Sequence, residues 1–231
     1  MYGDDSYEDN GFLTPAVKWI LTANAIVFFA QFLRGPFMEY WFALWPNLHS
    51  VVLQSSHGDI LAINSFKPWQ LVSYGFLHST ATYTHIVFNM LALWMFGQDI
   101  ERALGTRRFT LYYFVCVVGA AITHLVFATI THSFIPVIGA SGGIFGLLLA
   151  YGILFPRNNI YIMFLPIPIE ARFLVIIYGL LEVFSGLSAT RDGVAHFAHL
   201  GGMIFGFFMI QYWRGRFPFT GRGRFPPLRN F

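Results

Sequence analysis

A serine stands among glycines at the start of the apolar stretch IGASGGIFGLLLAYG, residues 138–152. Small residues spaced four apart let membrane helices pack closely, and Gly142 and Gly146 fit that spacing. Ser141 could equally act as a nucleophile, provided that a base lies beside it and that donors stabilise the oxyanion it generates. The stretch alone favours packing, so the chemical interpretation depends on partners elsewhere in the chain.

Histidines in another apolar segment, residues 194–213, could supply the base. His199, Gly202 and Gly206 lie at i, i+3 and i+7, so they share one helix face. Packing of this face on the small residues of the serine segment would bring His199 near the nucleophile. His196 lies three residues earlier on a similar face, so spacing does not choose between the two histidines.

A further segment, YTHIVFNMLALWMFG, holds His85 and Asn89 four residues apart and therefore on one helix face. Both side chains can donate to an anionic oxygen, as a serine hydrolase requires. The alternative is a structural hydrogen bond between helices. Spacing leaves both interpretations open.

No acidic residue has a spacing that would complete a triad. Asp192 precedes His199 by seven residues, about 10 Å along a helix, which is too far to orient the ring directly. Glu182 lies in a separate apolar segment and is expected to make a structural hydrogen bond. His124 is expected to be a satisfied core histidine. The sequence therefore predicts that any serine chemistry uses a dyad.

Composition places these residues in a membrane. The chain has 231 residues, of which 56% are hydrophobic and 11% charged, whereas a soluble domain carries about 25% charged residues. The single cysteine, Cys116, excludes an internal disulfide framework. Nearly charge-free runs predict an all-α membrane protein. The expected spans are 15–33, 83–101, 109–130, 139–155, 171–188 and 194–213.

Charge placement predicts the topology. Six spans put both termini on one side, and every Lys and Arg except Arg34, Lys67 and Arg191 then falls on that side, which the positive-inside rule makes cytoplasmic. The expected parts are an acidic cytoplasmic N-terminus without the basic start of a secretory signal, a six-span domain with an aromatic-rich interfacial loop, and a basic, disordered cytoplasmic tail. They cover residues 1–14, 15–213 (loop 34–82) and 214–231.

The fourth span is too short for the bilayer. Pro156 ends it, and Gly142 to Phe155 is 14 residues, or about 21 Å, against a hydrocarbon core of about 30 Å. Its helix would begin about 10 Å below the outer surface. Unpaired N–H groups at that start require a water-filled cavity, with Ser141 at its floor. They would also suit an oxyanion.

Three motifs occur in order on separate segments: His85-x-x-x-Asn89, Gly139-Ala140-Ser141-Gly142 and Ala198-His199-Leu200-Gly201-Gly202. With the long first loop and the turn Glu101-Arg102-x-x-Gly105, the chain resembles the rhomboid family of intramembrane serine proteases. The resemblance covers nearly the whole chain, from the first span to the sixth.

The resemblance implies that Ser141 is the nucleophile and that His199, rather than His196, is the base. His85 and Asn89, with the backbone N–H of Ser141, would form the oxyanion hole, and Gly139 matches the glycine that opens the serine motif. The implied fold is a six-transmembrane-helix bundle with a partly embedded first loop and a short fourth helix that starts inside the bilayer.

The implied activity is hydrolysis of a peptide bond in or near transmembrane helices of other membrane proteins. The resemblance implies neither metal nor other cofactor, and no nucleic-acid partner. The expected location is a bacterial cell membrane, with the lipid bilayer as the surrounding partner and both termini in the cytoplasm.

Three positions depart from the family pattern. Phe145 stands where tyrosine is common, so a ring remains for the base to stack on but the hydroxyl is lost. Trp69-Gln70 replaces a Trp-Arg pair, which puts the polar anchoring of the first loop in doubt. His78 and His85 are seven residues apart, where relatives often have five. None of these positions belongs to the dyad, so an active enzyme is expected.

Three other functions could account for some of these residues. A haem or metal bundle could use four histidines, yet it leaves the glycine-flanked serine unexplained and the zinc motif H-E-x-x-H is absent. A catalytically silent rhomboid-like adaptor that binds transmembrane helices would need neither Ser141 nor His199. A transporter would be expected to carry acidic residues in paired spans, and Glu182 stands alone. The four histidines are His85, His124, His196 and His199.

Overall fold

A computed structural model describes residues 12–46, 51–54, 60–162, 165–188 and 193–215. The other residues, which include Asp192, Arg191 and nearly all of both predicted terminal segments, lie outside the described part. The elements are α1 (Pro15–Phe42), β1 (Val51–Gln54), β2 (Ile60–Ile63), α2 (Gln70–Ser73), the 3₁₀ turn η1 (Tyr74–Phe76), α3 (Tyr83–Leu104), α4 (Thr106–Thr131), α5 (Ser141–Leu154), β3 (Asn159–Ile162), β4 (Leu165–Glu170), α6 (Ala171–Leu187) and α7 (Gly193–Trp213).

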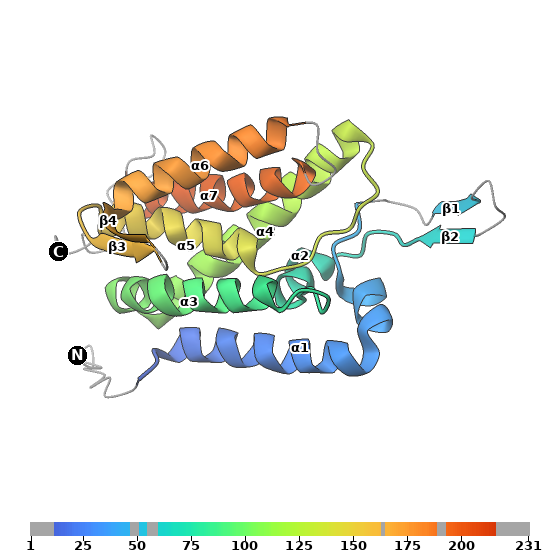
Figure 1. Cartoon of the computed structure of the whole chain (residues 1–231), viewed down its shortest axis with the longest axis horizontal. Coiled ribbons are helices and arrows are strands. Elements are labelled where there is room, and N and C mark those ends of the chain that lie inside the picture. The colour runs from blue at the N-terminus through green and yellow to red at the C-terminus, as the bar shows by residue number, and fades with distance from the viewer. Residues whose placement is uncertain (1–11, 47–50, 55–59, 163–164, 189–192, 216–231) are drawn as a thin grey trace.

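The six longer helices run in alternating directions, so α1 begins and α7 ends at the same end of the bundle (Figure 1). A helix lies at each of the six predicted segments. By length and composition α1 and α4 are able to cross a membrane, and α5 is a shorter apolar helix. Large apolar side chains cover the outer faces, among them Phe29, Ile130 and Phe184. The fold is therefore an apolar, mostly helical bundle.

The first loop is more ordered than the sequence indicated. The helix expected to end at residue 33 breaks at Arg34, whose φ of −144° and ψ of 36° are non-helical, and a second helical piece containing Pro36 continues to Phe42. An antiparallel hairpin, β1–β2, then pairs Val51 with Ile63. In Figure 1 this hairpin projects away from the bundle.

Gln70 anchors this loop to the end of α1. It is fully buried, and its Oε1 accepts from the backbone N–H groups of Lys67 (3.1 Å) and Trp45 (3.3 Å). Its Nε2 donates to the carbonyl of Trp41 at 3.3 Å, and Trp69 Nε1 donates to the same carbonyl at 2.9 Å. The doubt raised by glutamine in place of arginine is thus resolved, because the neutral amide itself anchors the loop.

Glu101 ties α1 and α4 to the end of α3. Its buried carboxylate accepts hydrogen bonds from Thr14 Oγ1 (2.6 Å) and from the N–H groups of Ala16 and Val17 (2.9 Å each). Thr106 Oγ1 donates to it at 2.8 Å. A helix N-terminus has free N–H groups and a positive dipole end, so a carboxylate there stabilises it. The Glu101 turn therefore fixes where α1 starts.

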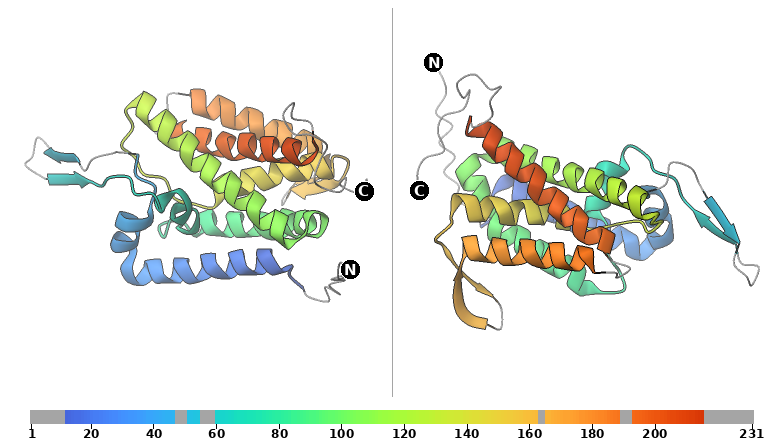
Figure 2. Two further views of the ribbon diagram at one scale, coloured as in Figure 1. Left: turned by 180° about the vertical axis from the view of Figure 1, so that it is seen from behind. Right: turned by 90° about the horizontal axis from the view of Figure 1, so that it is seen from above.

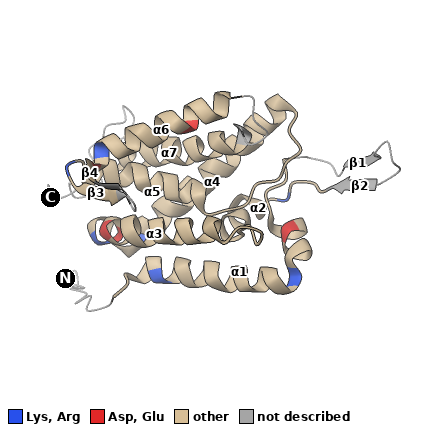
Figure 3. Ribbon diagram, viewed as in Figure 1, with Lys and Arg blue, Asp and Glu red and all other residues tan. Residues whose placement is uncertain are grey.

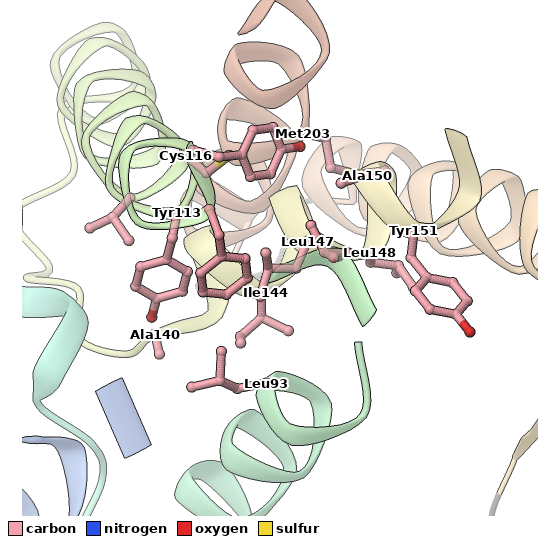
Figure 4. Close-up of a cluster of buried hydrophobic side chains, with 14 of the residues drawn as sticks. Leu93, Tyr113, Cys116, Ala140, Ile144, Leu147, Leu148, Ala150, Tyr151 and Met203 are labelled. Carbon is pink, nitrogen blue, oxygen red and sulfur yellow. The ribbon is translucent and has the colours of Figure 1, made fainter. Parts of the chain in front are cut away.

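The core surrounds α5. Figure 4 shows apolar side chains of α5, such as Leu147, meeting Leu93 of α3, Tyr113 of α4 and Met203 of α7. Figure 2 shows α7 crossing the bundle beside α4 and α5. Most residues of α5 are buried against these helices, so α5 is held by packing rather than by its own stability.

Glycines on α5 and α7 allow these helices and α4 to pack closely. A Cβ on Gly202 would overlap the carbonyl oxygen of Gly142, so these two helices touch backbone to backbone. Gly146 lies 3.3 Å from Gly202 O by the same measure, yet its tighter neighbour is Cys116 of α4. The atoms nearest to a Cβ on Gly206 belong to Tyr112 and Cys116 of α4. Backbone contact between α5 and α7 therefore occurs at Gly142 and Gly202, while the nearest neighbours of Gly206 belong to α4.

The link between α5 and α6 is a short hairpin. The three prolines of this link exclude a continuous helix, and β3 and β4 instead pair antiparallel, with Ile160 opposite Ile169. The hairpin turns the chain back, so α6 runs antiparallel to α5 (Figure 1).

Candidate active site

The site begins where α5 starts, at Ser141. The preceding Gly139 has φ of +126°, a conformation that disfavours any residue with a side chain. A Cβ there would also lie 2.7 Å from His85 Nε2. The expected helix start is confirmed, and α5 has 14 residues, about 21 Å. Gly139 therefore lets the chain turn sharply into α5 beside His85.

His199 of α7 lies against Ser141. Its Nε2 is 2.8 Å from Ser141 Oγ, within hydrogen-bond distance. The ring of Phe145 stacks on the His199 ring, with centroids 4.4 Å apart and planes 7° from parallel. His196 does not make this contact with the serine; its Nδ1 lies 2.6 Å from Glu182 instead. The geometry therefore separates the two histidines that spacing left equivalent.

The expectation that no acid reaches this histidine is wrong. Glu182 Oε2 lies 3.0 Å from His199 Nδ1, on the ring edge opposite the serine. The sequence hid this contact because Glu182 is 17 positions away on α6, and no local spacing reports how two helices are rotated against each other. The structure therefore presents a row of serine, histidine and glutamate in place of a dyad.

His85 and Asn89 line the same cavity as Ser141. The backbone N–H of Ser79 donates to His85 Nδ1 at 3.3 Å, which leaves Nε2, beside Gly139, as the protonated nitrogen of a neutral ring. Asn89 Nδ2 uses one hydrogen for the His85 carbonyl at 2.9 Å and keeps a second. Each side chain thus retains a donor for an anionic oxygen.

His78 is a residue of the site that sequence reasoning did not single out for a role. It is fully buried, and its Nε2 accepts weakly, at 3.5 Å, from the N–H of Ala140, which precedes the serine. Gln31 of α1 holds its backbone N–H and carbonyl at 2.9 Å each. Burial, reinforced by the nearby His85, lowers the pKa of His78 to about 4, so its ring is neutral at pH 7. The sequence marked His78 only by its unusual spacing from His85, which gave no indication of this contact.

A cavity of about 920 Å³ extends from these residues between α3, α5 and α6. Its walls are mostly apolar, formed by side chains such as Phe88, Met95 and Leu148. Phe88 and Tyr161, which both line the cavity, are 55% and 64% exposed, so the cavity reaches the outer surface of the bundle. The polar groups of the site therefore face a long apolar space.

One group of side chains could hold a metal ion. The ligand atoms of Glu182, His196 and His199 lie within 4.8 Å of one another. Among the described residues this group includes neither His85 nor His124, so the four-histidine bundle considered above is not assembled. His124 is buried in α4, away from this group, and lies beside the backbone of Ile135.

The described residues form an apolar helical bundle, and a serine–histidine pair lies at the start of its short helix α5. These two features define the class of protein. The model of the rhomboid domain family matches residues 65–216. The chain belongs to the rhomboid family.

Named relatives include bacterial and mitochondrial proteins. The chain is 27% identical over 203 residues to YdcA of Bacillus subtilis (strain 168), covering 86% of this chain and 90% of the relative. It is 35% identical over 142 residues to rhomboid protease GluP of Bacillus subtilis (strain 168), covering 61% and 25%. It is 30% identical over 209 residues to the mouse (Mus musculus) mitochondrial presenilin-associated rhomboid-like protein, covering 87% and 51%. The chain thus spans most of YdcA but about half or less of the other two.

Proposed function

We propose that the protein is an intramembrane serine endopeptidase that cleaves transmembrane segments of other membrane proteins. The observation that carries the proposal is the 2.8 Å contact between Ser141 Oγ and His199 Nε2 at the edge of the apolar cavity. A hydroxyl that donates to an imidazole nitrogen is the arrangement that activates a serine nucleophile.

The chemistry follows from these groups. Ser141 Oγ attacks the scissile carbonyl carbon while its proton passes to His199 Nε2. The oxyanion is stabilised by the second N–H of Asn89, by His85 Nε2–H and by the N–H of Ser141 at the start of α5. Collapse breaks the C–N bond, and His199 returns the proton to the leaving amine. Water, deprotonated by His199, then hydrolyses the acyl-enzyme and regenerates Ser141.

The cavity indicates the substrate class. Its apolar walls suit an apolar segment of another protein, whereas Ser141, His85 and Asn89 at one end supply the polar groups that hydrolysis requires. The outer faces of the helices are also apolar, as a lipid environment requires. A transmembrane helix that unwinds near the site would satisfy both surfaces.

The proposed topology has six spans within residues 15–213 and both termini in the cytoplasm of a bacterial cell. Figure 3 supports it, because basic and acidic positions gather at the two ends of the bundle and leave its middle almost uncharged. Lys18 lies near the start of α1, Arg102 near the end of α3 and Arg172 near the start of α6. These helix ends lie at the same end of the bundle (Figure 1), which would be the cytoplasmic end under the positive-inside rule. Residues 1–14 and 214–231 would be the cytoplasmic tails.

A fluorophosphonate probe tests the proposal in detergent. Wild type should be labelled covalently and should cleave a model transmembrane substrate, whereas Ser141→Ala should do neither and His199→Ala should lose cleavage. Ser188→Ala, at the exposed end of α6, is the matched control and should behave as wild type.

Two outcomes would contradict the proposal. Equal labelling of Ser141→Ala and wild type would assign the reactive serine elsewhere. A folded wild type that neither labels nor cleaves would instead favour a catalytically silent rhomboid-like adaptor.

A further inference from the structure

Glu182 is a buried carboxylate in the middle of α6. It is 9% exposed, and Figure 3 shows an acidic position within α6, away from the charged ends of the bundle. A carboxylate in such surroundings is costly unless donors surround it. Its donors are two imidazole rings of α7, at 2.6 Å (His196 Nδ1) and 3.0 Å (His199 Nδ1).

The contact decides which nitrogen of His199 carries the proton. A carboxylate only accepts, so His199 Nδ1 must be the donor. In a neutral imidazole the other nitrogen is then an unprotonated acceptor, and that nitrogen, Nε2, lies 2.8 Å from Ser141 Oγ. A general base requires this tautomer, with its free nitrogen on the nucleophile.

The His199 ring is also held in place. Phe145 covers one face of it at 4.4 Å, and Glu182 holds its Nδ1 edge. His196, one helical turn before His199, donates to the same Oε2 and thereby steadies the carboxylate from α7. Phe145 contacts the ring only through its apolar face, so the polar contact on the Nδ1 edge of His199 is the one that Glu182 makes.

We propose that Glu182 is the positioning residue of a Ser141–His199–Glu182 triad, with His196 fixing the carboxylate. The proposal rests on the proposed function of Ser141 and His199. During acylation the serine proton moves to His199 Nε2, while Nδ1–H remains hydrogen-bonded to the carboxylate. Glu182 stays ionised throughout and stabilises the imidazolium, and the Nε2 proton leaves with the amine.

A shared metal ion explains the distances less well. Ligand atoms 2.0–2.1 Å from a tetrahedral zinc lie about 3.3 Å apart. His196 Nδ1 and Glu182 Oε2 are 2.6 Å apart, which is the length of a direct charge-assisted hydrogen bond. The group is thus already satisfied by its own protons.

The test compares Glu182→Gln with Glu170→Gln. Each removes one carboxylate, but Glu182 lies within α6, whereas Glu170 is the N-cap residue that precedes it and forms an ion pair with Arg172. In detergent, Glu182→Gln should lower the fluorophosphonate labelling rate and kcat by at least about 10²-fold with KM unchanged. Glu170→Gln should match wild type. Glu182→Asp, which keeps the charge on a shorter side chain, should recover part of the lost rate.

A second readout does not depend on activity. Ring ¹⁵N resonances of His199, assigned by their loss in His199→Gln, should report protonated Nδ1 and unprotonated Nε2 in wild type, and a mixture of tautomers in Glu182→Gln. If Glu182→Gln does not fold, the wild-type spectrum and Glu182→Asp still provide the test.

The outcomes separate the two proposals. Wild-type kcat in Glu182→Gln, or a wild-type His199 protonated on Nε2, would overturn the triad while Ser141 labelling stands. A folded wild type without labelling would instead contradict the protease function. The tautomer of His199 in the ¹⁵N spectrum would still show whether Glu182 orients the ring.

Discussion

Two buried carboxylates, Glu101 and Glu182, lie in different regions of the bundle and differ in what they bind. Glu101, at the end of α3, accepts from backbone N–H groups and threonine hydroxyls, which do not change protonation near neutral pH. Glu182, within α6, accepts from two histidines, which do. The donors around a buried carboxylate, rather than its burial, therefore indicate whether it anchors helices or holds a group that can exchange protons.

The oxyanion donors lie in the same site as Glu182, and their removal should lower the rate strongly. His85→Ala and Asn89→Ala each remove one donor, so kcat should fall about 10²–10³-fold, or about 2.7–4 kcal/mol. Steady-state cleavage of a transmembrane substrate in detergent measures the loss, and thermal unfolding checks that the fold is kept. An unchanged kcat in both variants would return these residues to a packing role.

Glu101→Gln should change stability instead of catalysis. The amide group turns its own hydrogens toward some of the four donors, and each buried donor left without an acceptor costs about 1–3 kcal/mol. Denaturant unfolding in detergent should show this loss, with kcat per folded molecule unchanged. Asp99→Asn, on the exposed surface of the same helix, is the control and should unfold like wild type. A lower kcat with unaltered stability in Glu101→Gln would contradict the purely structural role assigned to Glu101.

Phe145→Leu should have a smaller effect, confined to the site. It removes the ring stacked on His199, an interaction worth about 0.5–1.5 kcal/mol, so kcat should fall by up to about 10-fold. Phe145→Tyr keeps the ring and serves as the control, with a rate near that of wild type. A loss as large as that of Glu182→Gln would mean that stacking, rather than the carboxylate, orients the base.

Chelation should have no effect. If Glu182 and its two histidines hold protons rather than a metal ion, dialysis against EDTA leaves the cleavage rate unaltered. Matched dialysis without EDTA is the control. A loss of activity that added Zn²⁺ restores would assign the cluster to a metal and remove Glu182 from the role proposed here.

Local sequence patterns predicted most of the helix positions. Apolar runs bounded by glycine and proline placed all six long helices, and Gly139 with Pro156 bounded the short α5. The hairpin β1–β2 and the extension of α1 past Arg34 were missed, because a mixed polar and aromatic loop has no clear period. The role of Gln70 was missed for a different reason: its partners lie on distant backbone.

The sequence by itself determined the apolar helices, the family motifs and the small residues that let α7 touch α5 at Gly142 and Gly202. These features depend on residue type and on spacing within a segment, so they can be predicted from the sequence alone. Helical spacing left His196 and His199 equivalent, and the motif resemblance favoured His199. Only the tertiary structure showed the contact of His199 with Ser141 and placed Glu182 on the other edge of the ring. Those contacts depend on how α5, α6 and α7 are rotated against one another, which is set by packing across the whole core.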